Sequence, residues 1–183
     1  MPLVTSEMNI ANALKKANII PQLVDESFSP SAMLQIQYKK SGQDIAPGNK
    51  LKPEETEEIP DIMFVPSDEN AYYTLMLVDP DAPSAQDSKN GPWRHWVVTN
   101  IPGSAGQVSA TAQHQQVTPY FKAAPPPGSG PHRYIFLLYK QNGGANQTFS
   151  VLDNNDRKRF DFKSYAQEHQ LELVGVNFFY AEN

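Results

Sequence analysis

The sequence predicts a mainly β protein, an antiparallel β-sandwich with a few short helices at its periphery. Three observations support this fold class. Several short apolar runs have the length of strands, only two stretches have the period of a helix, and 16 prolines and 10 glycines provide many turns. A chain of 183 residues fits one domain over residues 1–183. It needs no disulfide to fold, and it contains no cysteine.

The first predicted element is an amphipathic helix from Ser6 to Asn18. Thr5, Ser6 and Glu7 provide the start signals of this helix, and Pro21 limits its end. Because only one face of this helix is apolar, we expect it to lie on the domain surface. Its apolar residues recur at helical spacing: Met8, Ala11, Leu14 and Ala17.

The strands are predicted from two kinds of apolar pattern. Apolar and polar residues alternate over residues 34–39, which indicates a half-buried strand. Residues 62–65 form a shorter candidate, and the acidic stretch 52–60 is expected to be a solvated connection. Residues 103–131 contain few apolar side chains and are expected to be mostly loop. Continuous apolar runs predict central strands buried on both faces: Tyr72–Val78, Trp96–Ile101 and Tyr134–Tyr139.

The chain is predicted to end in a helix and a strand. Asp161 can cap a helix that runs from Phe162 to about Gln170. The final strand covers Leu171–Tyr180, where Gly175 indicates a bulge or a close backbone approach.

The charge of the chain argues against two classes of partner. The net charge is −5 and no basic stripe is visible, so no nucleic-acid partner is expected. The basic cluster at residues 157–159 is flanked by acidic residues and is interpreted as a solvated local patch. No apolar run approaches the ~20 residues that span a bilayer, so no transmembrane segment is expected. The N-terminus lacks a leader pattern, and we expect a cytoplasmic protein. His114 and His169 lie in polar surroundings and are interpreted as surface residues.

Candidate functional residues gather where the most apolar runs end. The run at residues 72–78 is followed by Asp79, Pro80, Asp81, Ala82 and Pro83. The two prolines fix φ and restrict the residues before them, which makes this turn stiff. Because Asp79 and Asp81 are two residues apart, their side chains can point to a common side.

Two further segments place imidazoles and aromatic rings at strand ends. Trp93 and His95 open one apolar run. His132 and Tyr134 open another and share one strand face, while Arg133 takes the other face and is interpreted as an ion-pair partner. Neighbouring carboxylates raise the pKa of an imidazole, so both histidines are expected to be charged near neutrality. Imidazolium and backbone N–H donors would form a site for a small phosphate or carboxylate.

Each of these residues also has a structural interpretation. Asp79 and Asp81 could cap a turn through their own backbone, as an aspartate beside proline often does. His95 and His132 could be ordinary strand or turn residues. Trp93 could be a core residue as readily as a pocket wall.

A second functional hypothesis is a metal-dependent phosphoester hydrolase. Asp79, His95 and His132 would form a site of two histidines and one carboxylate. An enzyme would also need a positioned base or nucleophile, and although Asp81 could serve as the base, no serine or threonine is evidently paired with one. The favoured hypothesis is therefore a non-catalytic binding protein with neither cofactor nor metal.

The same residues resemble the phosphatidylethanolamine-binding protein family, which includes the Raf kinase inhibitor proteins and plant flowering regulators. Its first signature is similar to residues 73–84, which are followed by ten residues and then His95. Its second signature is similar to residues 130–134, Gly-Pro-His-Arg-Tyr. The likeness covers most of the chain. Within the family, the chain most resembles fungal carboxypeptidase Y inhibitors, for example over Ser27–Ser31, Phe136–Gln141 and Asn177–Glu182.

This resemblance implies a Greek-key β-sandwich with a small pocket for a phosphate-type anion or a phospholipid headgroup. It also implies a cis bond between Ala82 and Pro83. Lys122 and Ala124 stand where animal members have Gly-x-Gly, so Lys122 is expected to add charge for the anion or to close part of the mouth. Asp81 is expected to support the site. The pocket residues that the resemblance implies are Asp79, Pro83, Trp93, His95, His132 and Tyr134.

The resemblance further implies how the protein acts. Members of the family inhibit protein partners by contact. The implied partner of this chain is a serine carboxypeptidase, a kinase or a Ras-regulating protein.

Overall fold

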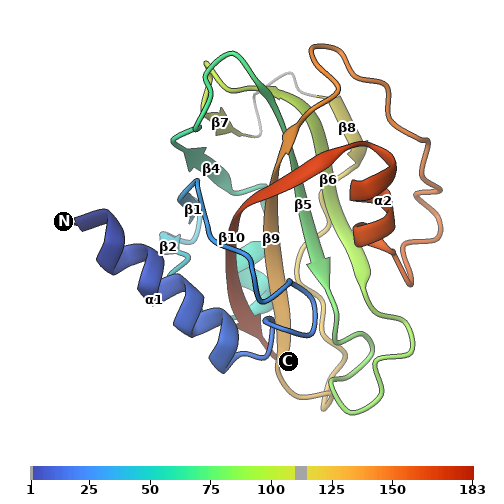
Figure 1. Cartoon of the computed structure of the whole chain (residues 1–183). Helices are drawn as coiled ribbons and strands as arrows, with labels where there is room; N and C mark the ends of the chain where they lie inside the picture. Colours follow the sequence, from blue (N-terminus) through green and yellow to red (C-terminus); the bar gives the residue numbers. More distant parts are fainter. Residues whose placement is uncertain (1, 110–114) are drawn as a thin grey trace.

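Two β-sheets and two short helices make up the computed structural model, which describes residues 2–109 and 115–183, with side chains from residue 9 onward (Figure 1). The four-stranded sheet has the order β2 (Gln43–Asp44), β1 (Leu34–Tyr38), β4 (Asp61–Phe64), β7 (Gln107–Val108). The six-stranded sheet has the order β3 (Asn49–Leu51), β10 (Leu171–Ala181), β9 (His132–Gln141), β5 (Tyr72–Asp79), β6 (Trp93–Pro102), β8 (Gln115–Thr118). The remaining elements are α1 (Pro2–Lys16), a 3-10 turn (Pro53–Thr56) and α2 (Phe162–Glu168).

The six-stranded sheet forms the middle of the molecule, because apolar residues pack on both of its faces. On one face, side chains such as Leu75 and Phe136 pack against Ile36 and Ile62 of the four-stranded sheet. On the other face, residues such as Leu137 pack against the two helices and the segment before α2. This double burial explains the continuous apolar runs of β5, β6 and β9, and it confirms the sequence prediction for these strands.

The connection order of the six-stranded sheet is that of a Greek key. The strands β5, β6 and β8 are antiparallel neighbours in turn, and the chain then returns so that β9 lies beside β5. One pairing departs from the antiparallel expectation, since β3 runs parallel to β10. The return of β9 brings its first residues beside the last residues of β5, and this juxtaposition creates the candidate site.

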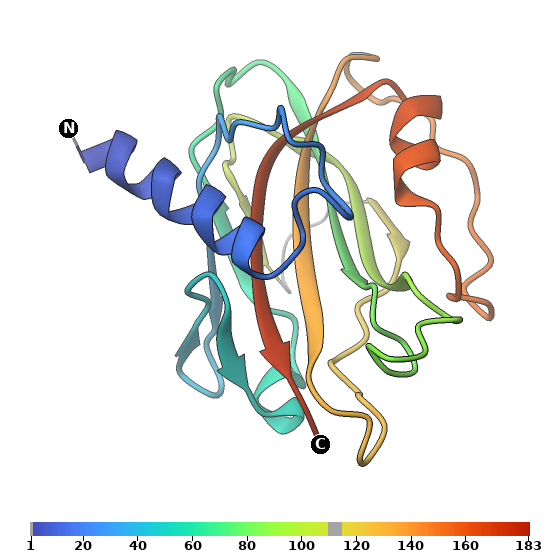
Figure 2. The same cartoon turned by 60° about the horizontal axis from the view of Figure 1, so that its bottom comes forward.

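The helices and loops differ from the prediction mainly in their limits. The helix α1 begins at Pro2, four residues before the predicted start, which agrees with the tolerance of a first helical turn for proline. Its last turns contact the core through the fully buried Leu14, and its N-terminal part projects away from the sheets (Figure 2). The side chain of Met8 lies outside the described residues. The predicted loop at residues 103–131 contains the short strands β7 and β8.

The C-terminal predictions are confirmed in detail. Asp161 accepts a hydrogen bond from the backbone N–H of Ser164 at 3.0 Å and so caps α2. The register of β10 against β9 shifts between Leu173 and Gly175, as expected for a bulge. The bulged Val174 uses its carbonyl to accept the N–H groups of residues 31 and 32, both at 2.9 Å. Within the described chain, no helix is both long enough and apolar enough to cross a bilayer.

The close packing at Gly175 makes one substitution diagnostic. A Cβ atom at this position would lie 2.9 Å from the carbonyl oxygen of Ala32, which the bulge holds in place. We therefore expect Gly175→Ala to lower the free energy of unfolding by about 1–3 kcal/mol in urea titrations. The matched control is Glu172→Ala on the exposed face of the same strand, which should change it by less than about 0.5 kcal/mol. Equal stability of the two variants would contradict this account of the bulge.

Candidate functional site

The candidate site lies at one end of the six-stranded sheet, where β5 ends and β6 and β9 begin. Asp79 is directly paired with Trp93 across β5 and β6. The register then shifts, because Val78 pairs with Arg94 and Leu77 pairs with Trp96, so His95 is the extra residue of a β-bulge. The bulge turns His95 toward the space between the sheets, where its ring meets the edge of Tyr134 with centroids 5.2 Å apart.

A buried pair between Asp79 and His132 forms the centre of the site. The Nδ1 atom of His132 lies 2.8 Å from Oδ2 of Asp79, and both side chains are at most 4% exposed. The other carboxylate oxygen, Oδ1, accepts the backbone N–H of Asp81 at 2.8 Å. Asp79 therefore has both roles that the sequence allowed: it stabilises its own turn and it orients an imidazole.

Hydrogen bonds around Ser129 indicate the protonation state of His132. The hydroxyl of Ser129 donates its single proton to the carbonyl of Pro126 at 2.7 Å, so at 2.9 Å it accepts from Nε2 of His132. Since Nδ1 faces the carboxylate of Asp79, this geometry favours a proton on both ring nitrogens, the imidazolium form. Burial lowers the pKa of His132, but the hydrogen bond and negative charge of Asp79 outweigh it and raise the pKa above 6.5.

His95 differs from the prediction, which made both histidines cationic. Its Nδ1–H donates to the carbonyl of Phe121 at 2.8 Å instead of to a carboxylate. Burial lowers the pKa of His95 below 6.5, and the carbonyl and the charge of Asp79 only partly offset this effect. The ring is therefore neutral near pH 7, and the site has one imidazolium.

Asp81 also departs from its predicted orientation. The strand ends at Asp79 and the chain turns through Pro80, so the alternation of an extended strand no longer applies. The carboxylate of Asp81 consequently binds Arg133, accepting its backbone N–H and Nε at 2.9 Å and its terminal nitrogen at 2.8 Å. Asp79 and Asp81 therefore do not share one side, and the ion-pair interpretation of Arg133 is confirmed.

The guanidinium of Arg133 connects this turn to α1. Its second terminal nitrogen donates to the carbonyls of Ala17 and Asn18 at 3.0 and 3.3 Å and to the side chain of Gln22 at 3.1 Å. A cation at the end of a helix is favourable, because the unpaired carbonyls there carry partial negative charge. The end of α1 and the candidate site are thereby held by the same two charged residues.

Two buried donors lie next to the pair. Among the described residues, neither the hydroxyl of Tyr134 nor Nε1 of Trp93 makes a well-formed hydrogen bond, although the hydroxyl lies close to the carboxylate of Asp79. Burial, followed by the negative charge of Asp79, raises the pKa of Tyr134 far above its usual 10, so its hydroxyl keeps the proton. The ring of Tyr134 stacks on His132 with centroids 6.3 Å apart, which places this donor beside the imidazolium.

Three further predicted site residues differ in their burial and in their contacts. Pro83 is half-buried and follows a cis peptide bond, as the resemblance implied. The ammonium group of Lys122 pairs with Glu57 at 3.1 Å, so neither expected role of this charge toward the anion is supported. Ala124 is exposed in the segment that precedes Ser129.

Sequence reasoning missed three contributors, because they act through contacts made only in the folded chain. Ser129 binds His132, and the backbone carbonyl of Phe121 fixes the tautomer of His95. Arg157 is half-buried and donates to the carbonyls of His95 and Pro119 at 3.2 and 2.9 Å, so it does not belong to a purely solvated patch. The only sequence signal was the proximity of Ser129 to the second signature.

Two other histidine predictions have different outcomes. His169 is 7% exposed and lies against the rings of Phe149 and Tyr165, so its assignment to the surface is wrong. The turn after α2 folds it under the preceding loop, where its Nε2 accepts the N–H of Ser150 at 3.2 Å. His114 lies outside the described residues.

The metal-site hypothesis required Asp79, His95 and His132 to converge on one ion. Over residues 2–109 and 115–183, no three His, Asp or Glu side chains are arranged to hold a metal. The pairing described above explains this result, because Asp79 and a carbonyl already bind the Nδ1 atoms of the two histidines.

Comparisons with known proteins agree with the resemblance found in the sequence. A family model described as phosphatidylethanolamine-binding protein matches residues 25–180. The chain is 34% identical to the carboxypeptidase Y inhibitor of Saccharomyces cerevisiae, over 93% of this chain and 94% of that protein. It is 33% identical to CEN-like protein 1 of Nicotiana tabacum, over 88% and 86% of the two chains.

Solved structures show the same relationship. A carboxypeptidase Y inhibitor, crystallised in complex with its cognate proteinase, has a TM-score of 0.83 at 32% identity and covers 97% of this chain and 96% of its own. The phosphatidylethanolamine-binding protein from Plasmodium vivax has a TM-score of 0.77 at 25% identity, with coverage of 94% and 97%.

The two central histidines should titrate in opposite directions. We expect NMR titration of the ring protons to give a pKa above 6.5 for His132 and below 6.5 for His95. Asp79→Asn should lower the pKa of His132, because it removes the carboxylate charge. Equal pKa values for His95 and His132 would contradict the assigned geometry.

The same pKa values predict how stability depends on pH. The stabilisation from His132 is fully present below pH 6.5 and is lost as pH rises through its raised folded-state pKa. His95 acts in the opposite sense: its stabilising effect is present above pH 6.5 and is lost as pH falls toward its lowered folded-state pKa. Denaturant unfolding of Asp79→Asn and wild type should therefore differ most at mildly acidic pH.

Proposed function

The chain belongs to the phosphatidylethanolamine-binding protein family, and on this premise we propose that it is a non-catalytic regulatory protein with two activities. It binds a small anion beside the Asp79–His132 pair, and it inhibits a protein partner by contact. The anion is a phosphate group, either free or as a lipid headgroup.

The proton donors around His132 support the proposal that an anion binds there. Three groups offer protons at this end of the sheet: Nε2 of the His132 imidazolium, the hydroxyl of Tyr134 and the indole N–H of Trp93. Two of them make no well-formed hydrogen bond in the described chain, and a buried donor without an acceptor costs about 1–3 kcal/mol. A phosphate offers several strong acceptor oxygens that could accept from Tyr134 and Trp93, and its charge is complementary to that of His132. The charged His132 beside these two donors is the observation that carries the proposal.

Ser129, His132 and Asp79 lie in the order of a serine hydrolase triad, which the sequence had not suggested. Distances of 2.9 and 2.8 Å join them. A nucleophilic serine must give its proton to the histidine, which must be unprotonated at Nε2. Here the carbonyl of Pro126 takes the serine proton and Asp79 favours the protonated ring, so His132 acts as a donor and not as a base. This proton arrangement supports a binding site over a hydrolase.

The similar proteins support the proposal that this chain inhibits a protein partner. A protein that is 34% identical to this chain is named carboxypeptidase Y inhibitor, and an inhibitor of the same name was solved with its proteinase. We propose that this chain likewise inhibits a serine carboxypeptidase.

Anion binding should depend on the protonation of His132. We expect calorimetric titration with sodium sulfate to show weaker binding as pH rises from about 5.5 to about 8.5, because sulfate keeps its charge while the imidazolium is lost. Tyr134→Phe should weaken binding by about threefold to tenfold, because one hydrogen bond is lost. Tyr72→Phe, at the opposite end of β5 from the cluster, is the matched control and should bind as wild type.

Ser129→Ala separates binding from hydrolysis. Loss of the hydroxyl frees Nε2–H of His132, so sulfate affinity should rise by about twofold to fivefold. Repeating the titration with inorganic phosphate and with short-chain phosphatidylethanolamine then distinguishes the free anion from the headgroup. Flat affinity across this pH range would overturn the imidazolium site. Labelling of Ser129 by a fluorophosphonate would overturn the non-catalytic proposal.

The inhibitory activity needs a separate assay. Purified chain should reduce the turnover of a chromogenic peptide by a serine carboxypeptidase in a stoichiometric titration, since the relative named above is such an inhibitor. Unfolded chain at the same concentration is the control. Full activity of the carboxypeptidase at excess chain would refute this partner class and leave the anion site standing.

A further inference from the structure

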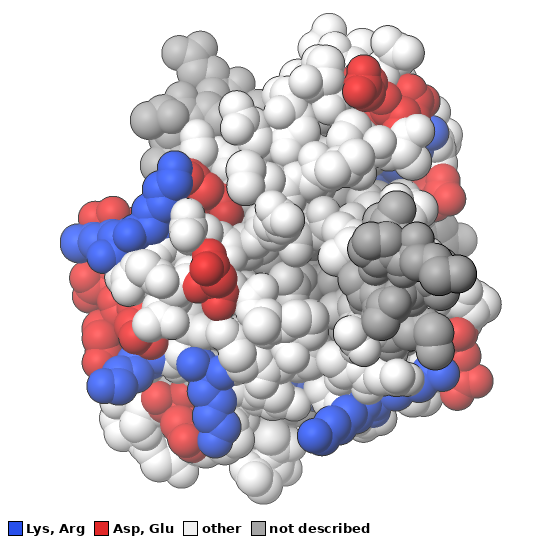
Figure 3. Space-filling view, turned by 90° about the vertical axis from the view of Figure 1, so that its left-hand side faces the viewer, with Lys and Arg blue, Asp and Glu red and all other residues white. Residues whose placement is uncertain are grey.

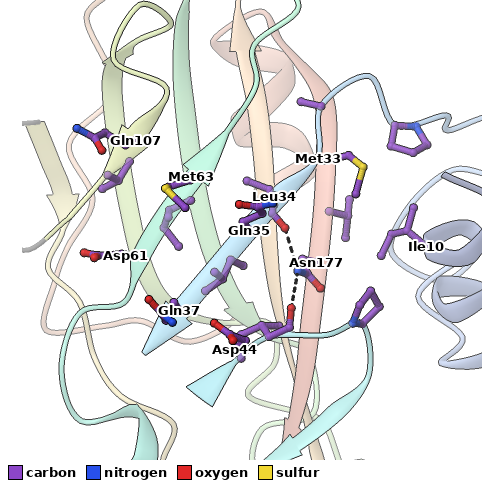
Figure 4. A pocket seen from close by; sticks show the side chains of 18 of the residues that line it. Ile10, Met33, Leu34, Gln35, Gln37, Asp44, Asp61, Met63, Gln107 and Asn177 are labelled. Carbon is purple, nitrogen blue, oxygen red and sulfur yellow. Dashed lines mark hydrogen bonds between the residues drawn. The ribbon is translucent and has the colours of Figure 1, made fainter. Parts of the chain in front are cut away.

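A second hollow lies on a different part of the molecule from the anion site. A groove of about 990 Å³ crosses the outer side of the four-stranded sheet and reaches α1. Figure 3 shows a neutral, hollowed area in the middle of this face, with charged side chains gathered around it. Figure 4 shows Gln107 and Met63 at one side of the groove and Met33 and Ile10 at the other. No residue of the anion site lines it.

Exposed apolar side chains line this groove. Met33 and Met63 are 41% and 52% exposed. They are two of the five large apolar residues that are exposed in the described chain. The solvent side of an antiparallel sheet is usually polar, so this composition indicates a contact surface. Flexible methionines are typical of surfaces that adapt to the side chains of a partner.

The polar groups of the groove suit a peptide more than a hydrocarbon chain. Gln35 and Gln37 point outward from β1, opposite Met63 and Asp61 of β4. Within the described residues, their side-chain amides have no hydrogen-bond partner, so each offers a donor and an acceptor. A peptide backbone carries the complementary groups, whereas an acyl chain would leave both amides unsatisfied.

The charges along the groove select a basic partner. Lys39 and Asp61 form an ion pair and neutralise each other. In the described part of the chain, no cation pairs with the carboxylate of Asp44, which also lines the groove. The groove therefore carries one uncompensated negative charge beside its apolar side chains.

We propose that this groove binds a segment of a partner protein that presents at least two apolar side chains and one Lys or Arg. The apolar side chains pack on Met33 and Met63, the segment's backbone bonds to Gln35 and Gln37, and its basic group pairs with Asp44. The inference is independent of the anion site, because the two sites share no residue.

A random dodecapeptide phage library, panned on the full chain, tests the proposal. Selected peptides should contain apolar residues and a Lys or Arg, and their binding is then measured by fluorescence anisotropy. Met63→Glu should weaken binding at least about tenfold, because it places a charge in the apolar contact. Asp44→Asn should weaken it by about twofold to fivefold and reduce its dependence on salt.

Val151→Glu is the matched control, because Val151 is 96% exposed and does not line the groove. It should bind peptide as wild type does, and the exposed positions of all three variants should leave the thermal unfolding midpoint unchanged. Selected peptides that lack basic residues, or that bind Met63→Glu as tightly as wild type, would overturn the proposal. A dimer in light scattering that Met63→Glu dissociates would assign the groove to a second copy. Loss of co-sedimentation with phosphatidylcholine vesicles in Met63→Glu would assign it to lipid.

Discussion

The buried contact between Asp79 and His132 is the interaction on which the candidate site depends. It joins the last residue of β5 to the first residue of β9, two segments 53 positions apart in the chain. Burial lowers the pKa of the imidazole, and the carboxylate raises it above its usual value, which favours the charged ring. Without that charge, the neighbouring hydroxyl and indole donors would remain, but the candidate site would lose the positive charge of His132.

The two aspartates of the first signature bind different partners. Asp79 binds the imidazole and stabilises its own turn, while Asp81 binds Arg133 and, through it, the end of α1. The backbone N–H of Asp81 donates to the carboxylate of Asp79, so the two aspartates are themselves linked. Hydrogen bonds therefore connect the turn, the second signature and the N-terminal helix. Breaking a buried ion pair of this kind costs about 3–5 kcal/mol, which explains why a fold would retain both charges near one strand end.

The candidate site and the groove lie on different parts of the fold and have opposite character. The site is a set of buried proton donors at the end of the six-stranded sheet, suited to a small ligand with acceptor oxygens. The groove is open, apolar and locally negative, on the outer side of the four-stranded sheet. A small ligand and a protein partner could therefore bind at the same time. This separation is consistent with a regulatory protein whose inhibitory contact does not pass through its ligand site.

The sequence by itself determined the fold class, the central strands and the residues at their ends. It could do so because the period of apolar residues and the chemistry of proline turns are local properties, as the runs of β5, β6 and β9 and the bulge at Gly175 illustrate. The charge of each histidine and the partner of each aspartate could be assigned only from the folded chain. Those depend on burial and on atoms distant in the chain: the carbonyl of Phe121 beside His95, Ser129 beside His132, and Arg133 turned toward Asp81 and α1. A pattern of residue types does not contain these distances, and proton positions follow from distances.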